Sequence, residues 1–419
     1  MFVYVLNMHG EPLMPCKPRK ARKLLKETKA KVVNRTPFII QLLYGSSGYK
    51  QQVNLGVDAG GKYIGVSATT MDKELFKATV ELRQDISKLL ESRKNQRRNR
   101  RSKLWYRKPR FLNRRNRKDK VAPSVQNKID CHLTIVRKVC SMLPVVNIIV
   151  ETAEFDLHKL MNPEVSGKGY QEGGAAGFYN VKAAVLSRDN YTCQICGKKN
   201  SKFEVHHIQF RSKGGSNMMD NLVTLCRDCH KRIHSGELLF DKKIKSFKHA
   251  SHMNIMRNRL VEELRLEFGN VFETFGYLTK HNREKLGIEK SHINDAFVIS
   301  HNFNAVRSGI EYCYRKIRRH NRQIHKAKPG KGGVRKRNQS LYIVNGFRRF
   351  DKVMYNDTEC FITGKRTNGY FQLKTFDGTV ISQGVSSKKL KLLEPIKGWL
   401  IDWRMAISPR PKEFEVSLP

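Results

Sequence analysis

The sequence predicts an α/β protein in which a mixed sheet with covering helices is interrupted by a small metal-binding module and followed by a small β-domain. Three observations lead to this class. Apolar strands and helical patterns alternate over residues 51–82 and 125–151. Two Cys-x-x-Cys pairs bracket adjacent histidines between residues 193 and 229, and residues 340–395 alternate like short strands.

The net charge of the chain indicates what kind of molecule the protein binds. The 419 residues include 81 Lys or Arg against 37 Asp or Glu, a formal net charge of +44. Clustered positive charge of this size predicts a polyanionic partner, and a nucleic acid fits best. The longest apolar runs, such as residues 145–150, are strand-sized and far shorter than the roughly 20 residues of a membrane helix.

The N-terminal run MFVYVLNMHGEPLMP lacks the basic start and the apolar length of a signal peptide. We therefore expect a cytoplasmic protein without a membrane partner. In a reducing compartment, the nine cysteines favour metal binding over disulfides.

The first predicted strands carry an acidic residue where they turn. QQVNLGVDAGGKYIGVSATT, at 51–70, predicts a buried strand, Asp58, a two-glycine turn and a second strand. Residues 74–82 predict a third strand after a short turn. A carboxylate that ends a buried strand is costly unless it binds something. The plainer alternative is a turn or cap residue.

Two further segments bring possible partners for this aspartate. Apolar residues at helical spacing predict a helix over 125–140, and the next strand, 145–150, delivers Glu151 at its end. SHINDAFVISHNF, at 291–303, predicts a helix with His292 and Asp295 on one face. Each acidic residue by itself is weak support for a site.

A basic segment separates the first two parts of this pattern. Residues 86–120 hold 16 basic and 2 acidic residues, so a helix there is cationic nearly all round. It is either a disordered tail or a rod surrounded by polyanion, and interleaved aromatic residues fit stacking on nucleic acid. The residues we expect to bind nucleic acid are Arg97, Arg98, Arg100, Arg101, Trp105, Arg107, Arg110, Arg114 and Arg115.

The cysteine pairs predict a structural zinc site. A two-residue spacer lets both sulfurs of a pair face one tetrahedral ion. The four expected ligands are Cys193, Cys196, Cys226 and Cys229, with 29 residues between the pairs. Four unbound core cysteines are the alternative.

The histidines are then available for a harder ion. FEVHHIQF predicts a strand, on which His206 and His207 point to opposite faces and have different roles. LVTLCRDCHKRIH predicts a strand that turns into a helix, where His230 and His234 share one face. Such a cradle suits metal-dependent phosphodiester cleavage, but spacing does not say which histidine of the adjacent pair does what.

This segment resembles the HNH nuclease family in its four-cysteine variety. The resemblance implies that His207 is the general base, that Asn221 orients it, and that His206, His230 and His234 hold one magnesium ion. The alternative is a zinc knuckle that binds nucleic acid without cutting it.

The wider order of strand–Asp–Gly-Gly–strand, strand–Glu and His-x-x-Asp resembles the split RuvC, or RNase H-like, nuclease fold. The resemblance implies a pair of magnesium ions held by Asp58, Glu151 and Asp295, with His292 assisting water activation. Manganese is the alternative metal.

The run Pro-Leu-Met-Pro at 12–15, together with these parts in this order, resembles the IscB family of transposon-encoded, RNA-guided endonucleases, relatives of the type II CRISPR effectors. The implied domains are PLMP (1–52), RuvC-like part I (53–84), arginine-rich bridge helix (85–120), RuvC-like part II (121–166), HNH with hinges (167–250), RuvC-like part III (251–325), and a basic linker with a C-terminal β-domain (326–419).

The family resemblance implies RNA-guided cutting of double-stranded DNA, with HNH cutting the guide-paired strand and the RuvC-like site cutting the displaced strand. Too few residues remain for a large recognition lobe, so we expect a long, structured guide RNA on a monomeric protein at a prokaryotic nucleoid. The C-terminal β-domain would hold guide RNA and read a target-adjacent motif. Two alternatives stay open: a protein-guided, homing-type HNH nuclease with a scaffold core, and a non-catalytic zinc-containing RNA-binding protein.

Overall fold

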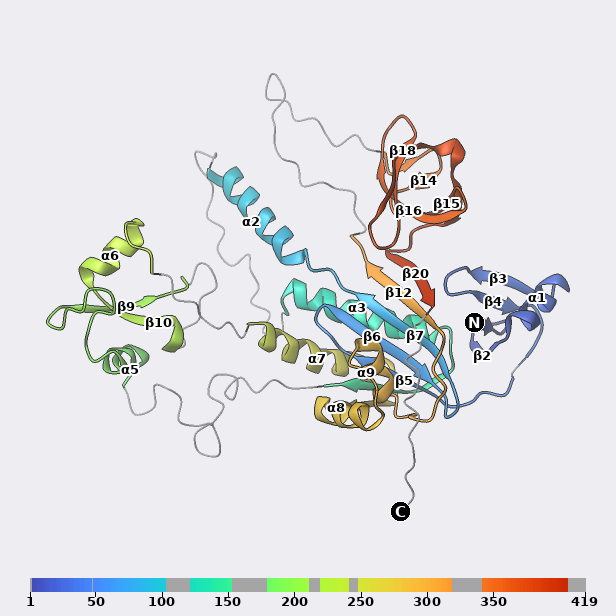
Figure 1. The fold of residues 1–419 in the computed structure, drawn as a ribbon, viewed down its shortest axis with the longest axis horizontal. Coiled ribbons are helices and arrows are strands. Elements are labelled where there is room, and N and C mark those ends of the chain that lie inside the picture. The colour runs from blue at the N-terminus through green and yellow to red at the C-terminus, as the bar shows by residue number, and fades with distance from the viewer. Residues whose placement is uncertain are drawn as a thin grey trace, which may run out of the picture. The chain divides into compact units, whose positions relative to one another are not determined.

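The computed structural model describes residues 2–46, 48–102, 121–152, 179–210, 219–240, 248–318 and 341–405 (Figure 1). The chain forms two compact units, of which the first joins Met1–Ala153 to Met253–Pro419 and the second is Glu154–His252. In the part of the chain so described, no helix combines the length and the apolar character that crossing a membrane requires.

A seven-stranded mixed sheet forms the core of the first unit. Its strands lie in the order β11-β8-β5-β6-β7-β12-β20. Neighbours β5–β6, β6–β7 and β12–β20 are antiparallel, and the other neighbours are parallel. The strands are β5 (Val53–Asp58), β6 (Tyr63–Thr69), β7 (Glu74–Glu81), β8 (Val145–Glu151), β11 (Val271–Thr274), β12 (Ile310–Lys316) and β20 (Trp399–Met405).

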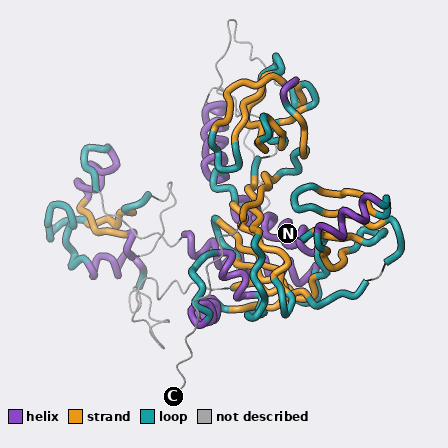
Figure 2. Tube along the Cα trace, turned by 45° about the vertical axis from the view of Figure 1, so that its right-hand side comes forward, coloured by secondary structure: helices purple, strands orange, loops and turns teal. Residues whose placement is uncertain are grey.

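Helices pack on both faces of this sheet (Figure 2). Apolar side chains that alternate along β5 and β6 share one buried cluster with α3 (Pro123–Cys140) and with α7 (Lys248–Glu267). The other face receives α9 (His292–Ile299), which in turn packs against α8 (Gly276–Lys285). One face of the sheet therefore packs against α3 and α7, and the opposite face packs against α9.

Two glycines let α9 lie directly on the strands. A methyl group at Gly56 would overlap the carbonyl oxygen of Ala296, and one at Gly65 would overlap that of His292. The helix is shorter than the predicted 291–303, because it ends at Ile299 and His301 takes a φ of 60°. Ser291 caps its first turn by accepting from the N–H of Asn294 at 3.2 Å.

The N-terminal residues form a separate four-stranded sheet in the order β2-β1-β4-β3. The Pro-Leu-Met-Pro run lies in its edge strand β2. Its elements are β1 (Val3–Leu6), β2 (Pro12–Cys16), α1 (Pro18–Lys26), β3 (Ala30–Asn34) and β4 (Ile39–Leu42).

The first half of the basic segment is helical, as predicted, in α2 (Ile86–Ser102). Arg97, Arg98 and Arg101 are exposed on it. The side chain of Arg100 lies outside the described part of the chain, as do Trp105, Arg107, Arg110, Arg114 and Arg115.

The predicted C-terminal strands form a five-stranded sheet in the order β18-β17-β16-β15-β19. Asp377 and Gly378 lie in the turn between β17 and β18, where Gly378 has a φ of 95°, which confirms the expected hairpin. The final strand β20 does not join this sheet but pairs with β12 of the core. The elements are β13 (Ile343–Val344), β14 (Phe347–Arg348), β15 (Lys352–Tyr355), β16 (Thr358–Lys365), β17 (Tyr370–Lys374), β18 (Val380–Ser386), η5 (Ser387–Lys389) and β19 (Lys391–Glu394).

The second unit contains the predicted strand–loop–strand–helix arrangement. β9 and β10 pair antiparallel, and α6 follows β10 without a linker. The glycine-rich hinge expected at 167–177 and the loop 211–218 lie outside the described residues. The elements are α5 (Val181–Arg188), β9 (Phe203–His207), η3 (Met219–Asn221), β10 (Leu222–Cys226) and α6 (Arg227–Ser235).

Candidate metal centres

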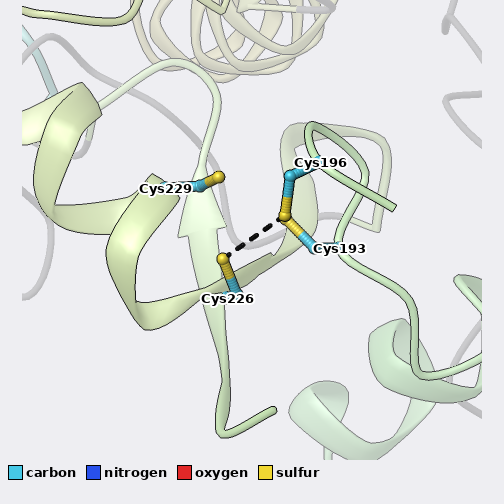
Figure 3. Close-up of side chains that lie close together, drawn as sticks. All are labelled: Cys193, Cys196, Cys226 and Cys229. Carbon is cyan, nitrogen blue, oxygen red and sulfur yellow. Dashed lines mark hydrogen bonds between the residues drawn. The ribbon is translucent and has the colours of Figure 1, made fainter. Parts of the chain in front are cut away.

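The four predicted cysteines come together in the second unit. Cys193 and Cys196 lie on one loop, Cys226 ends β10, and Cys229 lies in the first turn of α6 (Figure 3). Their sulfur atoms all lie within 4.8 Å of one another, and those of Cys196 and Cys226 are 3.6 Å apart. A set of four convergent sulfurs fits a tetrahedral zinc ion.

The thiols of this cluster differ: burial raises the pKa of Cys229 to about 12, whereas the surroundings of Cys193 favour its thiolate form. Burial tends to raise the pKa of Cys193, but backbone N–H groups of Cys196, Cys226 and Ile195 lower it to about 6. The thiolate is the form that binds zinc. Because the two pairs come from opposite ends of the segment, a bound ion would fasten the loop to β10 and α6.

The three predicted histidine ligands form a second cluster. His206, which is buried, reaches the cluster from β9, and His230 and His234 reach it from one face of α6. One ring nitrogen of each lies within 4.8 Å of the others. The Nε2 atoms of His230 and His234 are 3.3 Å apart, so they face the same point. His207, as the alternation of the strand predicts, is not a member of this cluster.

A carboxylate that the sequence analysis did not single out supports the cluster. Glu204 Oε2 lies 2.6 Å from Nδ1 of His230, which leaves the Nε2 of that ring for a ligand. Burial, followed by the charges of His230 and His234, lowers the pKa of His206 to about 4. Neutral imidazoles are the form that binds metal, and the cluster fits a divalent cation.

Asn221 holds the chain just beyond His207. Its side-chain oxygen accepts from the backbone N–H of Gln209 at 2.8 Å, and its amide donates to the Gln209 carbonyl at 3.2 Å. His207 pairs with Leu222, the residue after Asn221, across the two strands. Asn221 therefore holds the backbone two residues after His207, the predicted general base.

The predicted carboxylates meet at one edge of the core sheet. Asp58 and Glu151 end the neighbouring parallel strands β5 and β8, and α9 brings His292 and Asp295 to the same place. Nδ1 of His292 lies 2.5 Å from Oδ2 of Asp58, a partner that raises the pKa of the imidazole. Among the described residues, the ligand atoms of the three carboxylates lie farther apart than those of the four thiols or of the three imidazoles.

These carboxylates repel one another. Burial, and then the charge of Asp58, raises the pKa of both Glu151 and Asp295. Partly buried acids that disfavour each other's ionised form are stabilised by a bound cation. Oxygen ligands of this kind suit magnesium or another hard divalent ion.

The sequence analysis did not identify two arginines that lie near the carboxylates. Arg257 of α7 is buried, with Nη2 4.0 Å from Oε1 of Glu151 and Nε donating to the Ala59 carbonyl at 3.3 Å. Arg283 of α8 places Nε 2.9 Å from Oδ1 of Asp295. Arg257 interrupts the apolar face of α7 beside Met253, Met256 and Leu260, and this break in the pattern is the signal that would have found it.

Two family models match parts of this chain. Residues 3–173 match the family described as RRXRR protein, and residues 193–236 match the HNH endonuclease family. The second match covers the four clustered cysteines and His206, His207, His230 and His234.

Three known proteins are similar to parts of this chain. Anaredoxin of Nostoc sp. is 42% identical over 57 residues, which are 14% of this chain and 75% of anaredoxin. The type IV methyl-directed restriction enzyme EcoKMcrA of Escherichia coli is 34% identical over 85 residues, 18% of this chain but only 29% of that enzyme. Streptococcus thermophilus Cas9 in complex with AGGA PAM has a TM-score of 0.31 and 15% identity over 44% of this chain and 26% of that chain.

The histidine cluster on its strand–strand–helix frame, within the HNH match, defines a nuclease of the HNH class. The chain thus combines a segment that matches the RRXRR family with an HNH endonuclease domain, a combination consistent with the IscB-like nucleases that its motifs resemble.

Proposed function

We propose that this protein is an RNA-guided endonuclease that cuts both strands of DNA with two independent metal-dependent centres. The observation that supports it most is the presence, in separate units of one strongly basic chain, of a histidine cluster and a carboxylate set. Two different ligand chemistries indicate two sites that act separately, one for each strand. The domain boundaries 1–52, 53–84, 85–120, 121–166, 167–250, 251–325 and 326–419 are part of the proposal.

In the HNH centre, His206, His230 and His234 would hold magnesium, which when bound polarises the scissile phosphate. His207 would take the proton from the attacking water, and Asn221 would hold that histidine in place through the backbone of Gln209. Glu204 would keep His230 oriented. The thiolates of the cysteine cluster would hold structural zinc and fasten the unit.

In the core, we propose an RNase H-like, RuvC-type centre. Support comes from Asp58 and Glu151 at the ends of adjacent parallel strands and from α9, which adds His292 and Asp295. The three carboxylates would hold a pair of magnesium ions, with manganese as the alternative, and these would supply charge stabilisation at the phosphate. His292 would move a proton at its Nδ1, where it contacts Asp58.

Guide RNA would supply sequence specificity by base pairing. The exposed arginines of α2 would contact its phosphates, and the C-terminal sheet would bind the guide RNA and a motif beside the target. We further propose a transposon-associated, monomeric protein that acts at a prokaryotic nucleoid. The similarity to a restriction enzyme favours one other candidate, an HNH nuclease that recognises DNA through protein contacts over a scaffold core.

Strand-labelled target DNA, with RNA that co-purifies with the protein, tests this proposal. Asp58→Ala should leave only the guide-paired strand cut, and His207→Ala should leave only the displaced strand cut. Each cleavage rate should fall about 10²- to 10⁴-fold, the loss expected without a general base or comparable group. Cutting of both strands by Asp58→Ala, or cutting without RNA, would favour the protein-guided candidate.

A further inference from the structure

Two aromatic rings are exposed beside the carboxylate centre. Phe275 and Tyr277 lie at the start of α8 with ring centroids 5.9 Å apart and ring planes inclined by 13°, which is a stacked arrangement. Phe275 is 52% exposed and Tyr277 is 69% exposed. Exposed apolar side chains that lie together, rather than singly, are a feature of interaction sites.

The fold ties this pair to the proposed catalytic carboxylates. Thr274, the residue before Phe275, is the register partner of Glu151 in the parallel strands β11 and β8. The Thr279 hydroxyl of α8 lies between two acceptors, the Glu151 side chain and the Phe275 carbonyl oxygen at 3.4 Å, and can donate its proton to either one. Arg283, further along α8, pairs with Asp295. The helix that displays the rings is therefore the helix that supports the acids.

Positive charge lies beside the rings. Lys280 is exposed three residues after Tyr277, so it shares the side of α8 on which Tyr277 lies. The Lys280 ammonium is 3.9 Å from Glu284, an exposed pair of little energetic worth that leaves the ammonium accessible to a phosphate. A flat apolar surface with an adjacent cation matches a nucleobase and its phosphate.

We propose that Phe275 and Tyr277 stack an unpaired base of a single DNA strand and so deliver that strand to the carboxylate centre. A base paired within a duplex has both faces covered by its neighbours, whereas a single strand can place a base on an aromatic ring. The substrate class is thus single-stranded DNA. This inference rests on the proposed function of the carboxylates, and it adds the form in which their substrate arrives.

Photocrosslinking tests the contact without using activity. A single-stranded oligonucleotide carrying 5-iodouracil is irradiated with the full-length protein in the absence of added magnesium, and adducts are mapped by mass spectrometry. We expect an adduct on the peptide that contains Phe275 and Tyr277, and a much smaller yield from the same oligonucleotide annealed to its complement. No adduct there, or an equal yield from the duplex, would overturn the inference.

Cleavage kinetics test its consequence. Phe275→Ala with Tyr277→Ala should slow cutting of the displaced strand by about 5- to 150-fold, the loss of one stacked base. Phe275→Tyr with Tyr277→Phe keeps two rings and should restore the rate. Phe272→Ala, which removes an equally exposed ring on β11, is the matched control and should leave the rate close to that of the wild type.

The outcomes separate this inference from the proposed function. An adduct on the aromatic pair with no effect of Asp58→Ala on cutting would reject the catalytic centre but retain the binding of a single strand. Loss of cutting in Asp58→Ala with neither adduct nor rate change in the double variant would reject the stacking role alone. A changed oligomeric state of the double variant would assign the rings to a protein interface and overturn the inference.

Discussion

Nδ1 of His292 lies 2.5 Å from Oδ2 of Asp58, although 234 positions in the chain separate the two residues. The contact exists because α9 lies flat on β5 and β6 at two glycines. A strand end and a helix start thus form one centre only because nothing larger than hydrogen separates the helix from the sheet.

Replacing Gly65 by Ala should disrupt the carboxylate centre selectively. The new methyl group would overlap the His292 carbonyl oxygen, so α9 would have to move away from the sheet. We expect the free energy of unfolding of the core to fall by about 1–3 kcal/mol, the usual effect of overpacking, and displaced-strand cutting to be abolished. Denaturant unfolding and strand-labelled cleavage measure both effects.

Gly309→Ala is the matched control, because a methyl group at that position meets nothing within 4 Å. It should leave stability and cutting unchanged. Equal effects of the two substitutions would show that close packing of α9 is not what holds the centre.

The stability of the core should fall in mild acid because of His132. This side chain is completely buried in α3, and burial lowers its pKa to about 4. The folded pKa is below the unfolded value of about 6.5, so stability is fully present above pH 6.5 and is lost as the pH falls towards 4. At a pH of about 4.5 this one group should cost about 2–3 kcal/mol.

His132→Gln cannot titrate and should flatten that part of the pH profile. Fluorescence of Trp399, which is buried in the core sheet, can follow denaturant unfolding between neutral pH and the mildly acidic range. His281→Gln on the exposed side of α8 is the control and should retain the wild-type profile. A wild-type slope in His132→Gln would assign the acid sensitivity to other groups.

Removing zinc ligands should unfold the second unit alone. Cys193→Ser with Cys229→Ser breaks both halves of the cluster, and structural zinc contributes roughly 10–16 kcal/mol in small zinc modules. We expect loss of one zinc per chain and of guide-paired-strand cutting, with RNA binding retained. Metal analysis, circular dichroism and RNA titration check these outcomes.

Cys313→Ser removes a thiol from β12 of the core and should keep the zinc. A wild-type protein without stoichiometric zinc would contradict the assignment of the cluster.

Removing charge from α2 should change the salt dependence of RNA binding. We expect Arg97, Arg98, Arg100 and Arg101 to neutralise phosphates of the RNA. Replacing all four by Ala should then make the plot of log K against log salt concentration less steep, by about 0.7 for each phosphate that is no longer neutralised. The fourfold Lys variant keeps the charges and should keep the slope. Equal slopes for the Ala variant and the wild type would identify α2 as a solvated surface.

Local pattern was sufficient for much of the fold. Short apolar runs bounded by turn residues predicted β5, β6, β8, β9 and β10, because a buried strand appears in the sequence as such a run. The Cys-x-x-Cys spacing predicted the four-sulfur cluster, since two short spacers already determine how each pair can face an ion. The helical face of α6 likewise predicted that His230 and His234 lie together.

Only the tertiary structure decided which distant groups meet. Nothing local in β20 indicates that it leaves the C-terminal sheet and pairs with β12, because an alternating strand fits any available edge. Glu204 and Arg257 became part of the two centres through neighbours on other elements. The sequence by itself therefore determined the elements and the ligand types, whose periodicity and spacing are local. The fold determined their partners, because a meeting of residues hundreds of positions apart depends on packing that no short segment encodes.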